Sequence, residues 1–123
     1  MNPLLRLFAK PKMSTAEALL ALNSAVRGSN TEGIKKLISA YPELLGTADA
    51  KGSYPLHWAA EVQSLSSVAC LVDLGADTTQ KDQLGYTAEG VAHWHGEFRM
   101  GAYTDVCLKI VERLKHGPLQ KTA

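Results

Sequence analysis

The sequence has little of what marks most specialised classes of protein. It holds two cysteines in 123 residues, and 13 lysines and arginines nearly balance 12 aspartates and glutamates. Two cysteines are too few for a disulfide framework, and near-neutrality argues against a surface that attracts nucleic acid or anionic lipid. No apolar run approaches the length of a membrane span. We therefore expect a cytoplasmic, soluble protein with neither nucleic acid nor membrane as a partner.

The composition is that of one ordinary globular domain, with 46% hydrophobic and 20% charged residues. Cys70 and Cys107 both fall within apolar helical patterns, which predicts buried free thiols. The first residues, MNPLLRLFAKPK, place their basic residues behind the apolar run, the reverse of a secretory signal. We therefore interpret residues 1–13 as an N-terminal arm.

An internal repeat fills most of the chain. The interval from Gly52 to Gly85 equals that from Asp49 to Asp82. The apolar set of the middle unit recurs at nearly the same interval earlier in the chain and at a longer interval later in it. The longer interval predicts an insertion in the last unit, near residues 95–103. We divide the chain into repeats at about 14–48, 49–81 and 82–117, which together form one domain over 14–117, with a tail over 118–123.

Each unit reads as a helix, a short turn, a second helix and an extended loop. Capping residues, a proline in a first helical turn and apolar spacings of three and four residues give the limits. The first helices are predicted over about 15–26, 55–62 and 88–94. Of the second helices, the first begins at Asn30 or Thr31 and the next begins at Ser66 or Ser67 and ends at Gly75. The last runs over 105–116 and is closed by Gly117-Pro118.

The middle unit carries a recognisable motif. It reads Tyr54-Pro55-Leu56-His57-Trp58-Ala59-Ala60 and ends in Gly75-Ala76-Asp77. It resembles an ankyrin repeat, whose unit of about 33 residues opens with T-P-L-H-x-A-A and ends in G-A-D. The threonine of that opening is replaced by Tyr54. The resemblance implies an all-α solenoid of three stacked helix-turn-helix units, joined by β-turn or hairpin-like loops, over residues 15–116.

The same resemblance implies structural roles for the motif. It assigns them to Pro55, Leu56, His57, Gly52, Gly75 and Gly85. His57 is expected to join adjacent loops through hydrogen bonds, although Tyr54 in place of threonine removes the threonine hydroxyl that this histidine commonly meets nearby. Trp58 occupies a position that usually packs partly inside, and Glu89 stands where leucine is usually buried.

The function implied by the resemblance is binding rather than catalysis. Ankyrin arrays typically recognise proteins through their loop tips and the concave face of their first helices, so we expect another protein as the partner, with no cofactor. A short array with no attached domain would act by occluding or regulating that partner, an immunity protein that neutralises a toxin being a special case. The candidate contact residues are Arg27, Lys51, Ser53, Glu61, Gln83, Tyr86, Trp94, His95 and Arg99. Ala50, Val62 and Leu84 are neighbouring surface positions.

Other interpretations remain open at this point. Trp94 could pack under the insertion, and Phe98, Met100 and Tyr103 could cover the end of the array. His93, His95 and Glu97 alternate along the chain and could hold a metal ion, either for binding or in an enzyme. No zinc-protease motif accompanies them, so we expect no metal site and no catalysis. A monomer is expected, with self-association possible through an imperfect end of the array.

Overall fold

The computed structural model describes residues 13–96 and 105–116, and the regular structure in these ranges is helical. Three of the helices are α2 (Thr15–Arg27), α4 (Pro55–Glu61) and α6 (Ala88–Trp94). The others are α3 (Thr31–Ala40), the 3-10 helix η1 (Pro42–Gly46), α5 (Leu65–Asp73) and α7 (Asp105–His116). The predicted all-α class is therefore confirmed for these residues. Residues 1–12, 97–104 and 117–123, which include most of the predicted arm and insertion, Gly117-Pro118 and the tail, lie outside the described residues.

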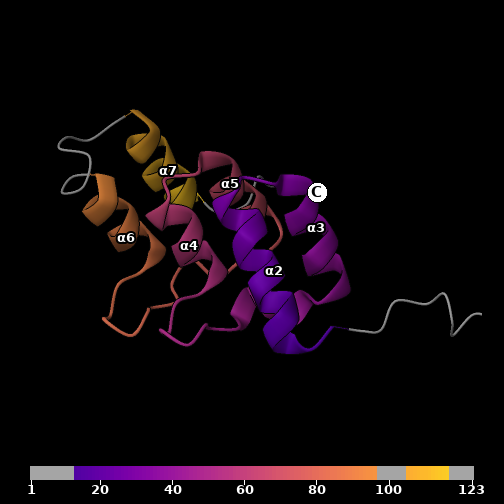
Figure 1. Ribbon diagram of the computed structural model, residues 1–123. Coiled ribbons are helices and arrows are strands. Elements are labelled where there is room, and N and C mark those ends of the chain that lie inside the picture. The colour runs from indigo at the N-terminus through magenta and orange to yellow at the C-terminus, as the bar shows by residue number, and fades with distance from the viewer. Residues whose placement is uncertain (1–12, 97–104, 117–123) are drawn as a thin grey trace, which may run out of the picture.

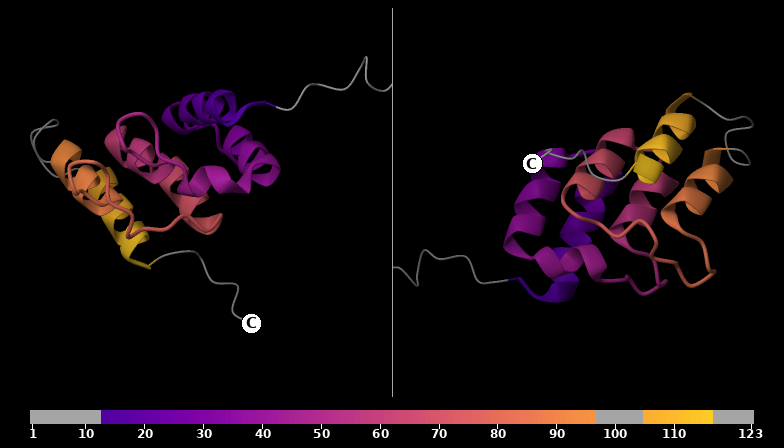
Figure 2. Two further views of the ribbon diagram at one scale, coloured as in Figure 1. Left: turned by 90° about the horizontal axis from the view of Figure 1, so that it is seen from below. Right: turned by 180° about the vertical axis from the view of Figure 1, so that it is seen from behind.

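The helices form two rows (Figure 1). The first row consists of α2, α4 and α6, in which α2 contacts α4 and α4 contacts α6. The second row consists of α3, α5 and α7, in which α3 contacts α5 and α5 contacts α7. Each helix of the first row also packs against the α-helix that follows it in the chain, so the rows are joined pair by pair. Figure 2 shows the three pairs, successive in colour, from below and from behind.

The core lies between the rows and is built from the predicted apolar stripe. Ile34, Val68 and Cys107 hold equivalent places in α3, α5 and α7, and each is fully buried. Their repetition at helical spacing gives each second-row helix one apolar face, which leaves water when the pairs stack. Cys70 and Cys107 are buried free thiols, as predicted, and burial raises the pKa of both.

Polar side chains cap most helix starts where the sequence predicts them. The Ser14 hydroxyl accepts a hydrogen bond from the Glu17 amide at 3.2 Å, and Asn30 caps α3 by accepting from the Gly33 amide at 3.0 Å. Such caps satisfy amides that have no partner inside the helix. The starts of α2 and α3 are thereby fixed by local chemistry.

The predicted start of α5 at Ser66 or Ser67 is wrong by one or two residues. The cap is Ser64, whose hydroxyl accepts from the Ser67 amide at 3.3 Å. Several serines in this stretch could cap a helix, and contacts with the preceding pair of helices select among them. The Ser64 and Ser29 hydroxyls lie 2.7 Å apart, while the Ser67 hydroxyl is fully buried and donates to the Val26 carbonyl at 2.7 Å.

The loops before α4 and α6 have the same hydrogen-bond pattern, one repeat apart. The amide of Asp49 donates to the carbonyl four residues on at 2.8 Å, and the amide of Asp82 does the same at 2.8 Å. In each loop the aspartate side chain also accepts from the amides two and four residues later. Gly52 and Gly85 have φ of +75° and +88°, the region that glycine adopts without strain, and Gly75 has φ of +105° after α5.

Candidate functional site

Two adjoining clefts lie over the first row of helices. The α4–α6 cleft has a volume of about 610 Å³ and the α2–α4 cleft one of about 520 Å³. Lys51, Ser53 and Glu61 line both clefts, so the two form one continuous surface, called here the groove. The groove crosses α2, α4 and α6, with the loops before α4 and α6 at one rim.

Eight of the nine predicted contact residues line this groove. Arg27 lines the α2–α4 cleft, and the α4–α6 cleft contains Lys51, Ser53, Glu61, Gln83, Tyr86, Trp94 and His95. Arg99 lies outside the described residues. Residues from three separate stretches of the sequence are thus gathered on one face by the stacking of the helix pairs.

An ion pair joins α2 to α4 within the groove. Arg27 Nη1 lies 3.2 Å from Glu61 Oε1, and Arg27 Nε donates to Asn23 Oδ1 at 3.1 Å. The two charged side chains are a little more than one third exposed, so water weakens their attraction and the pair contributes little to stability. Its consequence for the site is that these two charges already compensate each other.

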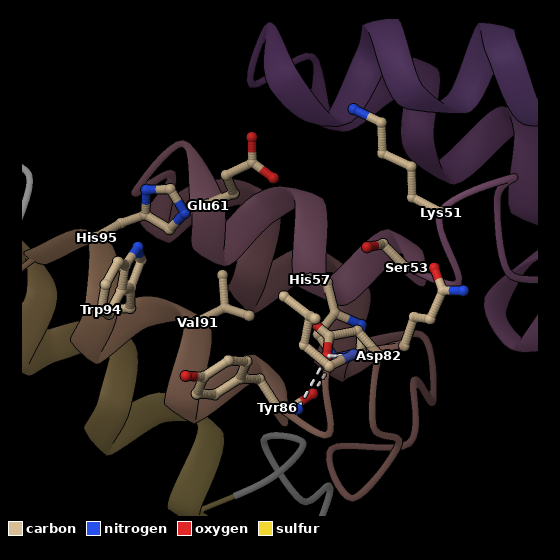
Figure 3. Close-up of a pocket in the computed structure, with 11 residues that line it drawn as sticks. Lys51, Ser53, His57, Glu61, Asp82, Tyr86, Val91, Trp94 and His95 are labelled. Carbon is tan, nitrogen blue, oxygen red and sulfur yellow. Dashed lines mark hydrogen bonds between the residues drawn. The ribbon is translucent and has the colours of Figure 1, made fainter.

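Large apolar side chains gather at the α6 end of the groove (Figure 3). Tyr86 is 44% exposed and Trp94 is 50% exposed. Gly90 holds the place in α6 that His57 holds in α4, and a Cβ there would stand 3.2 Å from the Tyr86 ring. The absent side chain at position 90 therefore leaves the Tyr86 ring room to lie against the helix.

His57 has a structural position below the groove. Its side chain is 3% exposed, and Nδ1 accepts a hydrogen bond from the Tyr54 amide at 3.1 Å. Nδ1 is therefore the acceptor nitrogen, and the neutral ring donates from Nε2 to the Tyr86 carbonyl at 2.8 Å. Through these two bonds the ring links the end of the loop before α4, at Tyr54, to the loop before α6, at Tyr86. The tyrosine at position 54 preserves the arrangement because its contribution comes from the backbone.

Trp58 is buried and belongs to the core. It is 1% exposed, and its indole nitrogen donates to Asp49 Oδ2 at 2.9 Å. Burial alone would raise the pKa of Asp49, but hydrogen bonds from the Ser53 amide, the Trp58 indole and the Lys51 amide, together with the Lys51 charge, lower it overall. The carboxylate of Asp49 is thus committed to holding the loop and the indole together.

The candidate metal ligands are only partly placed. His93 Nε2 lies 3.8 Å from Glu89 Oε1, and Lys115 Nζ lies 3.5 Å from the same oxygen, which gives Glu89 partners within the fold. His95 lines the α4–α6 cleft, and Glu97 lies outside the described residues. Among residues 13–96 and 105–116, no three histidine, cysteine or acidic side chains gather as a metal site.

Apart from Arg27, the α2 wall of the groove is absent from the predicted contact residues. Leu19 and Leu20 line the α2–α4 cleft, and Leu20 is 72% exposed. The two adjacent leucines in the sequence could have indicated an apolar contribution from α2 to this surface. The buried residues of α2 lie on one stripe, in which Ala18 is followed by Leu22 and then by Ala25 and Val26, at spacings of three and four residues. Leu20 falls outside that stripe, so its side chain is left facing water.

Comparison with known proteins adds no assignment, since no family model and no curated protein matches the sequence. In the part of the chain that the structure describes, the helices are too short or too polar to cross a bilayer.

Proposed function

We propose that this chain is a non-catalytic protein-binding module of ankyrin-like repeats. It would bind a partner protein through the groove and occlude or regulate the surface that it covers. The observation that carries the proposal is the convergence of eight predicted contact residues on one groove, with half-exposed Tyr86 and Trp94 at one end.

The repeated loop geometry supports the ankyrin-like interpretation. The hydrogen-bond pattern begun by Asp49 recurs at Asp82, and the loops themselves are joined through His57. The turn between the helices of a pair also recurs. Ser29 and Gln63 hold equivalent places in successive units, and both have positive φ, at +56° and +58°. A sequence period that reappears as a period in backbone conformation is typical of repeat proteins.

The groove has the composition of a binding surface. Tyrosine and tryptophan supply large, rigid contact areas and dominate the energetics of many interfaces, and here Tyr86 and Trp94 are both about half exposed. Charged side chains, those of Lys51, Glu61 and Asp82, line the same cleft as the two aromatic rings. An interface of roughly 800 Å² per side is the standard size for a specific complex and suits a module of three helix pairs.

The proposal can be tested by affinity capture from a lysate of the source organism. The tagged chain would be compared with a Tyr86→Ala/Trp94→Ala variant and with Leu108→Ala. Leu108 is a matched control because it is 53% exposed on α7 and lines neither cleft. All three would first be shown to have similar melting temperatures.

We expect one protein to be retained by the parent chain and by Leu108→Ala, and to be lost from the double variant. Binding assays with that purified partner should then show a loss of affinity of tenfold or more. Equal capture by all three chains would refute the groove as the binding site.

A further inference from the structure

The aspartates of the two equivalent loops differ in one hydrogen bond. In each loop the aspartate Oδ1 accepts from the amides two and four residues later. Asp49 Oδ2 also accepts from the Trp58 indole nitrogen at 2.9 Å. Asp82 Oδ2, by contrast, accepts no hydrogen bond from the residues that the structure describes. One acceptor of Asp82 is therefore left for another donor.

The difference arises at one position of the first-row helices. Val91 of α6 follows Asp82 by the interval at which Trp58 of α4 follows Asp49. The valine side chain carries no N–H group and is much smaller than that of tryptophan. The third unit thus lacks both the donor and the bulk that the indole supplies in the middle unit.

The α4–α6 cleft lies beside the position of the missing indole. Trp58 and Asp49 line the α2–α4 cleft, and the α4–α6 cleft is lined by their equivalents, Val91 and Asp82. The α4–α6 cleft is the larger of the two, at about 610 Å³ against about 520 Å³. A smaller side chain at position 91 leaves room where the middle unit is filled by its own indole.

The wall beside Val91 is aromatic. Figure 3 shows the rings of Tyr86 and Trp94 on the same side of the cleft as Val91. Both residues are about half exposed, so a flat side chain that packed against them would remove apolar surface from water. The cleft therefore offers aromatic surface and a hydrogen-bond acceptor together.

We propose that the α4–α6 cleft binds a tryptophan side chain of the partner protein. Its indole nitrogen would donate to Asp82 Oδ2, and its rings would pack against Val91 and Tyr86. This inference rests on the proposed protein-binding function and names the residue that the partner contributes.

The acceptor and the aromatic surface together select tryptophan. Leucine or phenylalanine would cover the Asp82 oxygen without a donor, and an acceptor buried without a partner is costly. Arginine brings donors, but its charge gains little here, because Lys51 lines the same cleft and Glu61 is already paired with Arg27. An indole is neutral, so its fit does not depend on the net charge of the groove. The middle unit already pairs its own indole with the aspartate of the equivalent loop.

The first experiment measures the binding of small probes to the full chain by titration of its amide NMR signals. The probes are N-acetyltryptophanamide, its 1-methylindole derivative, which lacks the N–H donor, the corresponding phenylalanine and arginine amides, and free tryptophan. We expect the tryptophan amide to bind with a dissociation constant on the order of 1 mM and to shift the signals of Asp82 and Val91. The methylated, phenylalanine and arginine probes should bind about tenfold more weakly, because each lacks the donor or the ring.

Two variants, each with a matched control, then locate the site. Asp82→Asn leaves one oxygen for the loop amides and replaces the other by a donor. It should weaken binding of the tryptophan amide about tenfold and abolish its advantage over the methylated probe. Asp77→Asn is the control, because Asp77 also accepts from the amide two residues later, at 2.8 Å, and lines neither cleft.

The second variant, Val91→Trp, should abolish binding, because the chain's own indole would occupy the site. Val62→Trp is its control, since Val62 is exposed and lines neither cleft, and it should leave binding unchanged. If Val91→Trp does not fold, Asp82→Asn decides the result.

No binding of the tryptophan amide at millimolar concentrations, equal binding of the methylated or arginine probe, or binding unchanged by Asp82→Asn would each overturn this inference. Tighter binding of free tryptophan than of the blocked amide would also overturn it, because the ligand would then be an amino acid and not a side chain of a partner. A protein captured through Tyr86 and Trp94 would still uphold the proposed function in any of these cases, so the two failures are distinguishable.

Discussion

Replacing His57 by alanine tests whether adjacent loops are held together as the structure indicates. The change removes a side chain that is 3% exposed, together with the bonds from the Tyr54 amide and to the Tyr86 carbonyl. Leaving a buried polar group without its partner costs about 1–3 kcal/mol. The cavity left by the ring adds to this cost. We expect a loss of about 3 kcal/mol in the free energy of unfolding.

Urea denaturation followed by circular dichroism would measure this loss. Lys36→Ala is the control, because Lys36 is an exposed residue of α3. We expect less than about 0.5 kcal/mol from the control. The expected loss for His57→Ala corresponds to a melting temperature lower by roughly 10 °C or more. A cost below about 1 kcal/mol would refute the argument that the ring joins the two loops.

The remaining predictions concern loops and caps. In urea titrations, Gly52→Ala should lower the free energy of unfolding by about 2 kcal/mol and Gly85→Ala should lower it by about 1 kcal/mol. Both glycines have positive φ, but only at position 52 would a Cβ also come close to the neighbouring loop, at 2.9 Å. Ser67→Ala should lower the free energy of unfolding by about 1–2 kcal/mol, because it removes a buried hydrogen bond. The control Ser66→Ala, at an exposed position, should lower it by less than about 0.5 kcal/mol, and equal losses would contradict the role of the buried bond. The pKa of Asp49 is lowered on folding, so its ionised form stabilises the fold above its ordinary pKa near 4, and that stability is lost as the pH falls through the lowered folded value. Melting curves recorded from neutral to strongly acidic pH should therefore show a smaller acid loss for Asp49→Asn than for the parent chain.

Equivalent positions in α4 and α6 have different roles beside the groove. Position 57 carries a histidine that supports the loops, whereas the equivalent position 90 carries glycine and accommodates the Tyr86 ring. The same helical position thus serves stability in one pair and surface shape in the next. Repeat proteins permit such changes because each unit contacts only its neighbours.

The helices could be predicted closely because their determinants are local. Ser14 and Asn30 cap helices with their own side chains, and Pro55 occupies a first turn, where a missing amide is tolerated. The start of α5 could not be fixed in this way. Several serines there offer similar caps, and the selection of Ser64 depends on hydroxyl and carbonyl groups contributed by the preceding helix pair.

Much of the groove's membership could also be read from the sequence, since a repeat places equivalent residues on one face. Which of its charges are paired, and which of its apolar side chains are exposed, could not be read from the sequence. The pairing of Arg27 with Glu61 joins residues of two different helix pairs, so no local pattern predicts it. The exposure of Leu20 follows from which stripe of α2 meets the other helices.

Apart from the start of α5, the sequence by itself determined where the helices begin and end. It also determined the period at which they recur and the apolar stripe that makes them pack, because each depends on neighbouring residues and on helical spacing. Only the tertiary structure decided that Trp58 is buried against Asp49 while Tyr86 and Trp94 remain exposed. All three are amphipathic aromatic residues. What separates them is whether a neighbouring helix or loop covers the ring, and that is a property of the stacked pairs together.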